Sequence, residues 1–527
     1  MTRHAGWMRW RGGENELPRQ YTDAARKLLG ELRNRLHLGP ANSGVARTTL
    51  KDGTTVEAKV EGGLHLVRVV PPKRKGKKGG KLIRRFRQYM FVSIGAYGYA
   101  YGSRGGFYIY HMEDYIYTEE GPIDNAKLQA VAKPYKKIFE HKGFLDDLQG
   151  IAISADATKV TFEEYAGFPS AGIYVWDIKN PAAPTQLSFQ FVSYDSAVFQ
   201  SIYASNDRYS FLDYSPSFGG GYYYAPQGGA SSYREVPPII PGGGTSISYG
   251  VDSSHKTKNV FANLYISYGE AIQPYARGRA CVMKDGDVVT YFGQAQDDGI
   301  FGGEIHLSKD EKQVYTVSAT LTPNRAGGTG KEFLGGVWAY DIHYDAVDSS
   351  KITSVTLAGG MYAYKYTGNY MTKPKGIDKL YLYAKRNTIW EIKEKDVQNF
   401  GEIDKTNPIP PTGVRAITIP QPNAPNGAPR DILLDNFSAD GKRLYLQVTK
   451  PPKNPDTGGF YGGYGMDNHF LVCSVLDGSI LKTVYYDGGG INGPYGVYGE
   501  ALTDTCNPTQ SRNKTWLVEL PPIVVYD

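Results

Sequence analysis

The sequence has few cysteines and no long apolar run. Of its 527 residues only three are cysteines, Cys281, Cys473 and Cys506, and their wide spacing matches no metal site. Such a sparse, odd set is typical of a protein that folds in a reducing compartment without disulfides. No run of about 18 apolar residues occurs, so we expect no membrane-spanning helix. The N-terminal segment lacks an apolar core, and we therefore expect no signal peptide.

Motifs of catalysis are also missing. The 9 histidines are scattered, none at zinc-binding spacing, and no Gly-x-Ser-x-Gly turn occurs. Lys331 is followed by Glu332, so a phosphate-binding loop would lack its hydroxyl ligand for magnesium. No helical pattern follows Gly488–Gly493, which we interpret as a glycine-rich turn although it matches Gly-x-Gly-x-x-Gly. We therefore expect no catalytic residues, no cofactor and no metal site, and hence no enzyme.

Glycine and tyrosine, in contrast, are abundant. The chain has 63 Gly and 42 Tyr against only 8 Met, which favours strands and turns over helices. Between residues 149 and 191, apolar residues alternate with polar neighbours on both sides of the polar turn Ser154–Lys159. Two more strand patterns follow, at 173–178 and 187–191. Four short antiparallel strands in succession are typical of one propeller blade.

This unit recurs along the chain. Three copies share the pattern apolar-Ser-x-Asp-x-x-x-apolar, with the serine and aspartate at Ser154 and Asp156, Ser308 and Asp310, and Ser438 and Asp440. Weaker copies surround Asp207, Asp252 and Asp378. The spacing of roughly 45 to 65 residues per copy is that of a propeller blade with inserted loops. The pattern predicts a mainly β chain, a β-propeller of about seven four-stranded blades; the alternative is a β-sandwich with accidental similarity.

Three regions are predicted. Residues 1–72 should form a helix, from Pro18 to a stop at Gly39-Pro40, and a three-stranded meander over 48–50, 56–60 and 64–70. Residues 73–87 should form a basic linker, and residues 88–527 the propeller. We expect the propeller to close by pairing strands from 88–118 and 496–526, which would remove open sheet edges. Residues 127–144 could form a short helix.

The predicted linker carries the basic character of the chain. Nine of its fifteen residues are Lys or Arg, and without them the net charge of +6 would become 6 − 9 = −3. Such a run binds phosphates without reading sequence, or it joins two domains and docks on an acidic protein surface; both readings stay open. These nine residues are the candidate interaction site: Lys73, Arg74, Lys75, Lys77, Lys78, Lys81, Arg84, Arg85 and Arg87.

Function can be inferred only by resemblance. The stretch Ala46–Gly63 with its proline break resembles the opening of structural proteins of tailed bacteriophages, and the blades resemble β-propellers in general, including WD40-like ones. The phage resemblance implies a non-enzymatic tail or nozzle protein in the virion. It would be present in several copies, bound to itself and to other virion proteins, and would act in assembly, host contact or DNA exit.

Two alternatives remain. A carbohydrate-binding or hydrolytic propeller would need carboxylates such as Glu163, Glu164 or Asp298 at the mouth of the central channel. An intracellular scaffold propeller would be a monomer that binds peptides on one face.

Overall fold

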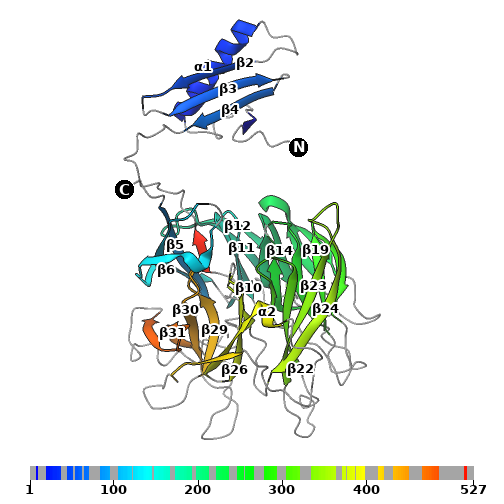
Figure 1. Cartoon of the computed structure of the whole chain (residues 1–527). Helices are drawn as coiled ribbons and strands as arrows, with labels where there is room; N and C mark the ends of the chain where they lie inside the picture. The colour runs from blue at the N-terminus through cyan, green and yellow to red at the C-terminus, as the bar shows by residue number, and fades with distance from the viewer. Residues whose placement is uncertain are drawn as a thin grey trace, which may run out of the picture. The chain divides into compact units, whose positions relative to one another are not determined.

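The chain divides into two compact units, Met1–Ile83 with Val524–Asp527, and Arg84–Ile523. The structure is a computed structural model (Figure 1). It describes residues 8–9, 19–36, 44–51, 54–61, 64–70, 83–94, 105–120, 123–144, 147–165, 172–192, 198–212, 221–236, 246–254, 256–265, 278–293, 304–320, 334–363, 371–374, 377–385, 387–397, 414–420, 431–449, 466–485 and 515–518. Within these ranges, no helix is long and apolar enough to cross a membrane.

The smaller unit packs one helix on one sheet. The helix α1 (Arg19–Leu36) lies against a sheet of order β1-β4-β3-β2, formed by β1 (Met8–Arg9), β2 (Gly44–Thr49), β3 (Thr55–Glu61) and β4 (Leu64–Val70). Leu28 and Leu32, four residues apart on one helix face, are buried against Val56, Ala58 and Val67 of the sheet. The predicted helix and meander are confirmed, and β1 is a strand that the pattern did not predict.

The larger unit is a β-propeller, as the repeats predict. In its described residues, six four-stranded antiparallel sheets follow one another along the chain. The first sheet is formed by β9 (Asp147–Ile153), β10 (Lys159–Tyr165), β11 (Gly172–Asp177) and β12 (Thr185–Phe191), and the second by β13 (Val198–Ala204), β14 (Asp207–Leu212), β15 (Gly221–Ala225) and β16 (Ser232–Glu235). The third is formed by β17 (Ser246–Ser253), β18 (Val260–Tyr265), β19 (Gly278–Lys284) and β20 (Asp287–Phe292), and the fourth by β21 (Ile305–Leu307), β22 (Gln313–Thr320), β23 (Leu334–Tyr344) and β24 (Ile352–Ala363). The fifth is formed by β25 (Met371–Thr372), β26 (Lys379–Lys385), β27 (Thr388–Lys393) and β28 (Arg415–Thr418), and the sixth by β29 (Asp431–Phe437), β30 (Arg443–Thr449), β31 (Met466–Ser474) and β32 (Ile480–Tyr485). A short helix, α2 (Glu394–Val397), follows β27.

The first strands of neighbouring sheets contact one another, as in β9 with β13 and β13 with β17. The fourth strands β12 and β16 are exposed along most of their length. The first strand of each sheet is therefore the inner strand, and the fourth is the outer one.

A seventh sheet joins the two ends of this unit. It has the order β33-β5-β6-β7, from β33 (Thr515–Val518), β5 (Arg84–Ile94), β6 (Gly105–Tyr117) and β7 (Gln129–Ala132), and β8 (Lys136–Phe144) also pairs with β6. In the β33–β5 pair, Trp516 lies opposite Tyr89. A strand from the C-terminal region thus completes a sheet begun more than 400 residues earlier, which removes an open edge from the ring.

The helix predicted for residues 127–144 is wrong. This segment contains only the end of a 3-10 turn, η1 (Asn125–Lys127), followed by β7 and β8. In β8, Phe139 pairs with Ile109 and Glu140 with Tyr108 of β6. Backbone pairing to an existing strand outweighs the weak helical preference of a lysine-rich segment, because propensity is a small term beside tertiary contacts.

The Ser-x-Asp pattern corresponds to one repeated turn between the first and second strands. Ser154 Oγ donates to Asp156 Oδ1 at 2.6 Å, and the equivalent distances in the other two copies are 2.9 and 2.6 Å. The fourth residue of each turn has positive φ: Ala157 at 53°, Glu311 at 60° and Gly441 at 67°. Only glycine adopts this conformation without steric cost, so two of the three turns are strained.

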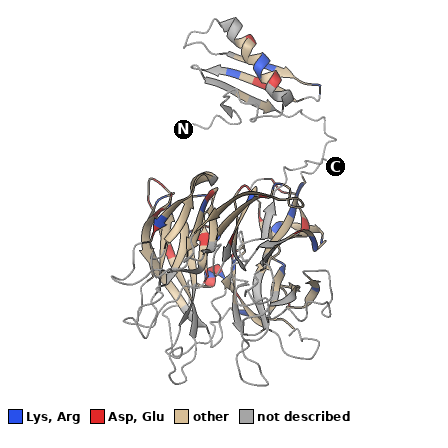
Figure 2. Ribbon diagram, turned by 180° about the vertical axis from the view of Figure 1, so that it is seen from behind, with Lys and Arg blue, Asp and Glu red and all other residues tan. Residues whose placement is uncertain are grey.

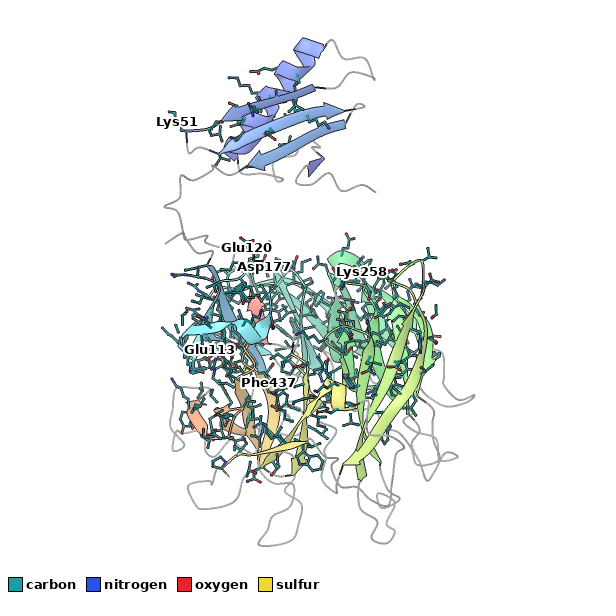
Figure 3. All side chains as sticks on the ribbon, in the orientation of Figure 1. Lys51, Glu113, Glu120, Asp177, Lys258 and Phe437 are labelled. Carbon is teal, nitrogen blue, oxygen red and sulfur yellow. The ribbon has the colours of Figure 1, made fainter. Side chains whose placement is uncertain are left out.

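Many of the tyrosines lie inside the propeller, where the side chains in Figure 3 are dense. Seven are less than 2% exposed: Tyr110, Tyr115, Tyr209, Tyr222, Tyr315, Tyr381 and Tyr445. The hydroxyl groups of Tyr209 and Tyr222 find partners in the neighbouring sheet. Tyr222 donates to Gly286 O at 2.7 Å, and Tyr209 accepts from Gly286 N at 2.9 Å. Tyrosine therefore fills the space between blades and also hydrogen-bonds the turn of the next blade.

Candidate functional site

Of the nine predicted basic residues, three lie in the described part of the chain. Arg84, Arg85 and Arg87 belong to β5, so the last residues of the predicted linker form part of a propeller strand. Arg84 donates to Glu119 O at 2.7 Å and lies over the Tyr117 ring at 4.7 Å. Arg85 and Arg87 are both exposed, and Arg87 Nε is 3.6 Å from a carboxylate oxygen of Asp114. The other six lie outside the described residues: Lys73, Arg74, Lys75, Lys77, Lys78 and Lys81.

The described surface of the propeller shows no comparable concentration of charge. In Figure 2, basic and acidic segments are interspersed along its strands. Since the chain without the nine residues has a net charge of −3, the basic segment differs in sign from the rest. An electrostatic contact with an acidic partner would therefore centre on this segment.

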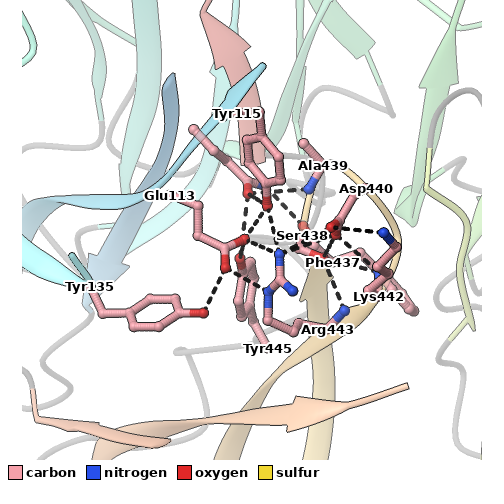
Figure 4. Close-up of polar contacts among 11 residues, drawn as sticks. Glu113, Tyr115, Tyr135, Phe437, Ser438, Ala439, Asp440, Lys442, Arg443 and Tyr445 are labelled. Carbon is pink, nitrogen blue, oxygen red and sulfur yellow. Dashed lines mark hydrogen bonds and ion pairs between the residues drawn. The ribbon is translucent and has the colours of Figure 1, made fainter. Parts of the chain in front are cut away.

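A buried ion network joins the seventh sheet to its neighbour (Figure 4). Glu113 of β6 is 0% exposed and Arg443 of β30 is 5% exposed. Arg443 Nη2 donates to Glu113 Oε2 at 2.8 Å, and Arg443 Nε lies 2.6 Å from Oε1. Asp440, on the repeated turn, accepts from Arg443 Nη2 at 3.2 Å. The two charged residues are 330 positions apart in the chain, and their pairing spans the seam where the ring closes.

Tyrosine hydroxyls complete the coordination of the Glu113 carboxylate. Tyr135 donates to Oε1 at 2.8 Å and Tyr445 to Oε2 at 3.2 Å, and Tyr115 also donates to Oε2. Burial, and then the charge of Glu113, raise the pKa of Tyr115 far above its usual value, so its hydroxyl stays a donor. Burial lowers the pKa of Arg443, but the hydrogen bond to Glu113 outweighs this and the pKa rises. The network therefore keeps the Arg443 guanidinium in its charged form.

Gln88 of β5 extends the same seam. Its Nε2 donates to Phe437 O at 2.9 Å, and its Oε1 accepts from Ala439 N at 3.2 Å. Sequence reasoning missed Gln88, Glu113 and Arg443. A signal was present in the spacing of charged and aromatic residues along the strands. Glu113 and Tyr115 are two residues apart and therefore share a strand face, and the same holds for Arg443 and Tyr445. A charged residue on the same face as a buried aromatic indicates a buried ion pair, but does not identify its partner.

Of the three carboxylates named for the enzyme alternative, only the Glu163 side chain lies in the described residues, so that alternative stays untested. Glu163 is 0% exposed and accepts from Ser201 Oγ, which is itself 2.6 Å from Ser210 Oγ. Glu163 therefore joins β10 to the next sheet. The side chain of Glu164, and all of Asp298, lie outside the described residues. Within the described ranges, no three His, Cys, Asp or Glu residues are placed to hold a metal ion.

One pocket lies among the tight turns of three consecutive sheets. It has a volume of about 410 Å³, and its lining is polar throughout: Ser154, Asp156, Lys159, Ser205, Asn206, Asp207, Gln227 and Lys258. Figure 3 labels Lys258 at the end of the propeller where these turns lie. Sequence reasoning identified Ser154 and Asp156 as turn residues but could not place the three turns together.

Comparison with known proteins identifies no family for this chain. No family model matches it, and no curated protein does. Similar solved structures include the Swd1 propeller domain of Myceliophteria thermophila, at 8% identity over 70% of this chain and 95% of that one, with a TM-score of 0.38. KlAtg21, solved with the coiled coil of AgAtg16, has 10% identity over 76% and 100% of the two chains and a TM-score of 0.41.

The periplasmic gluconolactonase PpgL of Pseudomonas aeruginosa has 12% identity over 76% and 96% of the two chains and a TM-score of 0.34. One of these three neighbours is an enzyme and another is bound to a protein. At such identities the likeness extends to the propeller fold alone.

Proposed function

We propose that this chain is a non-enzymatic structural component of a tailed-phage virion, present in several copies at the tail or nozzle. The observation that carries the proposal is the two-unit architecture. A small unit with its own helix-on-sheet core is followed along the chain by a strongly basic segment and then a propeller. The resemblance to phage structural proteins rests on the first of these parts, the stretch Ala46–Gly63 with its proline break, and the basic segment is consistent with it.

The outer strands supply contact surface for such an assembly. In β12, Leu187 is 52% exposed, and Phe189 and Phe191 are each 43% exposed. The strand has the sequence TQLSFQF, without charge, proline or glycine. Natural proteins protect exposed edge strands from pairing by placing charged residues or proline in them. An apolar edge strand without this protection favours burial against another chain.

The buried seam supports a mechanical role. A propeller completed by a four-residue strand needs further contacts to stay closed under load, and the Glu113–Arg443 network supplies them between the seventh sheet and its neighbour. Because breaking a buried ion pair is costly, the ring resists opening at the seam. An enzyme does not require this feature, whereas a component that transmits force or guides DNA benefits from it.

The basic segment is assigned to protein contact within the particle, with non-specific DNA contact as the second candidate. A variant with all nine Lys and Arg residues of 73–87 changed to Gln separates the two. Light scattering of the full-length wild-type chain should give the mass of several copies, and the variant should dissociate to single chains.

An intact assembly that has lost binding to random-sequence duplex DNA would assign the segment to phosphates instead. A wild-type chain that remains a monomer at every concentration would refute the multi-copy proposal itself.

A further inference from the structure

The polar pocket is built by three sheets rather than by one loop. Ser154, Asp156 and Lys159 come from the β9–β10 turn, Ser205 and Asn206 from the β13–β14 turn, and Lys258 from the β17–β18 turn. Ala155 N donates to Ser205 O at 3.0 Å, which fixes the first two turns relative to each other. The shape of the pocket is therefore set by the packing of the blades.

Part of the lining is already satisfied and forms a rigid wall. Asp207 is 3% exposed, and its Oδ2 accepts from Lys258 Nζ at 2.9 Å. Its Oδ1 accepts from Gln227 N at 2.8 Å. Since Asp207 and Lys258 compensate each other, neither presents an unbalanced charge to a ligand.

Three other groups keep hydrogen-bonding capacity. Asp156 Oδ1 accepts from Ser154 Oγ, from Thr158 N at 3.1 Å and from Thr158 Oγ1 at 2.8 Å, so Oδ2 is the oxygen left to accept. Asn206 Oδ1 is buried and has no partner among the described residues. A buried acceptor without a partner is unfavourable, and a hydrogen-bond donor on a ligand would remove that cost. Lys159 lines the same pocket as these two acceptors and supplies an ammonium donor.

The protonation state of Asp156 suits this role. Burial raises the pKa of its carboxyl group, but the hydrogen bonds from Ser154 and Thr158 and the charge of Lys159 outweigh burial and lower it. The group is therefore an ionised acceptor at neutral pH.

The lining selects one class of ligand. It contains no apolar side chain, so it offers no surface for an aliphatic or aromatic group. Two Asp and two Lys balance in formal charge, so a strongly charged ion gains no net attraction. Acceptors and a donor line the same pocket, which suits the hydroxyl groups of a sugar because each hydroxyl donates and accepts. The volume of 410 Å³ equals about fourteen waters at ~30 Å³ each, enough for a short saccharide.

We propose that the pocket between the β9–β10, β13–β14 and β17–β18 turns binds a neutral carbohydrate through Asp156 Oδ2, Lys159 Nζ and Asn206 Oδ1. The binding does not depend on the number of chains in an assembly, so it goes beyond the proposed structural role and can fail independently of it. No bond is made or broken; the site is one of recognition.

The test is saturation-transfer NMR of the full-length chain with maltose, lactose and N,N′-diacetylchitobiose at millimolar concentration, with zwitterionic glycine and anionic methyl phosphate, both of which carry C–H protons, as charged probes. At least one saccharide should give transfer signals, and neither charged probe should. Asp156→Asn keeps one oxygen for the Ser154 and Thr158 bonds but replaces the other by an amide, and Lys159→Met removes the ammonium group. Each should weaken saccharide binding at least tenfold.

The repeat offers a matched control. Asp310 occupies the equivalent position in another copy of the turn, where Ser308 Oγ donates to it at 2.9 Å and Lys312 N at 3.1 Å, but it does not line the pocket. Asp310→Asn removes a carboxylate from the equivalent turn and should leave saccharide binding unchanged. The proposal is overturned if no saccharide binds, if methyl phosphate or glycine binds instead, or if the Asp156 and Asp310 variants behave alike.

Discussion

Removing Arg443 should destabilise the propeller more than removing any half-exposed arginine. Arg443→Met keeps most of the side-chain volume but leaves the Glu113 carboxylate, 0% exposed, without its cation. Breaking a buried ion pair costs about 3–5 kcal/mol. Glu113 would retain the hydroxyls of Tyr135 at 2.8 Å and Tyr445 at 3.2 Å, so we expect the lower end, about 3 kcal/mol.

The assay is urea unfolding of the full-length chain, combined with hydrogen exchange of peptides from β6 and β30. With a denaturant slope of about 3 kcal/mol per molar, the midpoint should fall by about 1 M. Exchange should accelerate on both sides of the seam, in β6 as well as in β30, because the pair crosses it.

Arg415→Met is the matched control. The Arg415 side chain is 38% exposed and pairs with Glu391 at 2.7 Å, but Glu391 also keeps Lys379 at 3.1 Å and the hydroxyl of Tyr381 at 2.9 Å. Its loss should cost about 1 kcal/mol or less. The double variant Glu113→Gln with Arg443→Met should be more stable than Arg443→Met alone, because it buries no unpaired charge. Equal costs for the Arg443 and Arg415 variants would refute the assignment of the seam as a stabilising contact.

Three further predictions concern the turns, acid stability and the thiols. Gly441→Ala should destabilise the chain by at least about 1 kcal/mol in a urea titration, because the φ of residue 441 is +67° and the new Cβ would lie 2.1 Å from Ile377 Cδ1. Ala157→Gly should raise the urea midpoint, because glycine adopts the φ of 53° at this position without steric cost. Burial raises the pKa of Glu391, but the hydrogen bonds from Arg415, Lys379 and Tyr381 outweigh burial and lower this pKa below its ordinary value of 4.5. The ionised Glu391 therefore stabilises the fold fully above about pH 4.5, and this stabilisation is lost as the pH falls through the pKa of the folded state. The stability of Arg415→Met should accordingly depend less on pH in that window than the stability of the wild type. Burial raises the pKa of Cys473 to about 12 and raises that of Cys281 further. In a Cys506→Ser variant, a thiol reagent should therefore label neither cysteine before the chain unfolds. Rapid labelling of the native chain would contradict the burial of these two thiols.

The local features of the fold were predictable because they depend on short-range patterns. The serine and aspartate of the repeated turn are two residues apart, and their hydrogen bond forms within the turn itself. The helix face of Leu28 and Leu32 follows from the period of 3.6 residues. A pattern confined to a few residues carries its own structural cause, so the blade repeat and the small unit could be inferred without coordinates.

The seam and the pocket could not be predicted, because both depend on contacts between distant segments. Glu113 and Arg443 are 330 residues apart, and nothing near either one identifies the other. The pocket needs the spatial order of three turns, and β8 becomes a strand only because β6 offers it a partner. The start of β5 at Arg84 is a similar case, since a basic run predicts solvent exposure more strongly than strand pairing.

The most direct test of the proposed function is the copy number of this chain in purified tailed virions from the source culture. Quantitative mass spectrometry would count the chain against a structural protein of known copy number, and gold-labelled antibodies would locate it by electron microscopy. The proposal predicts several copies per particle, with label at the tail. Purified infectious particles that contain none of the chain would contradict it.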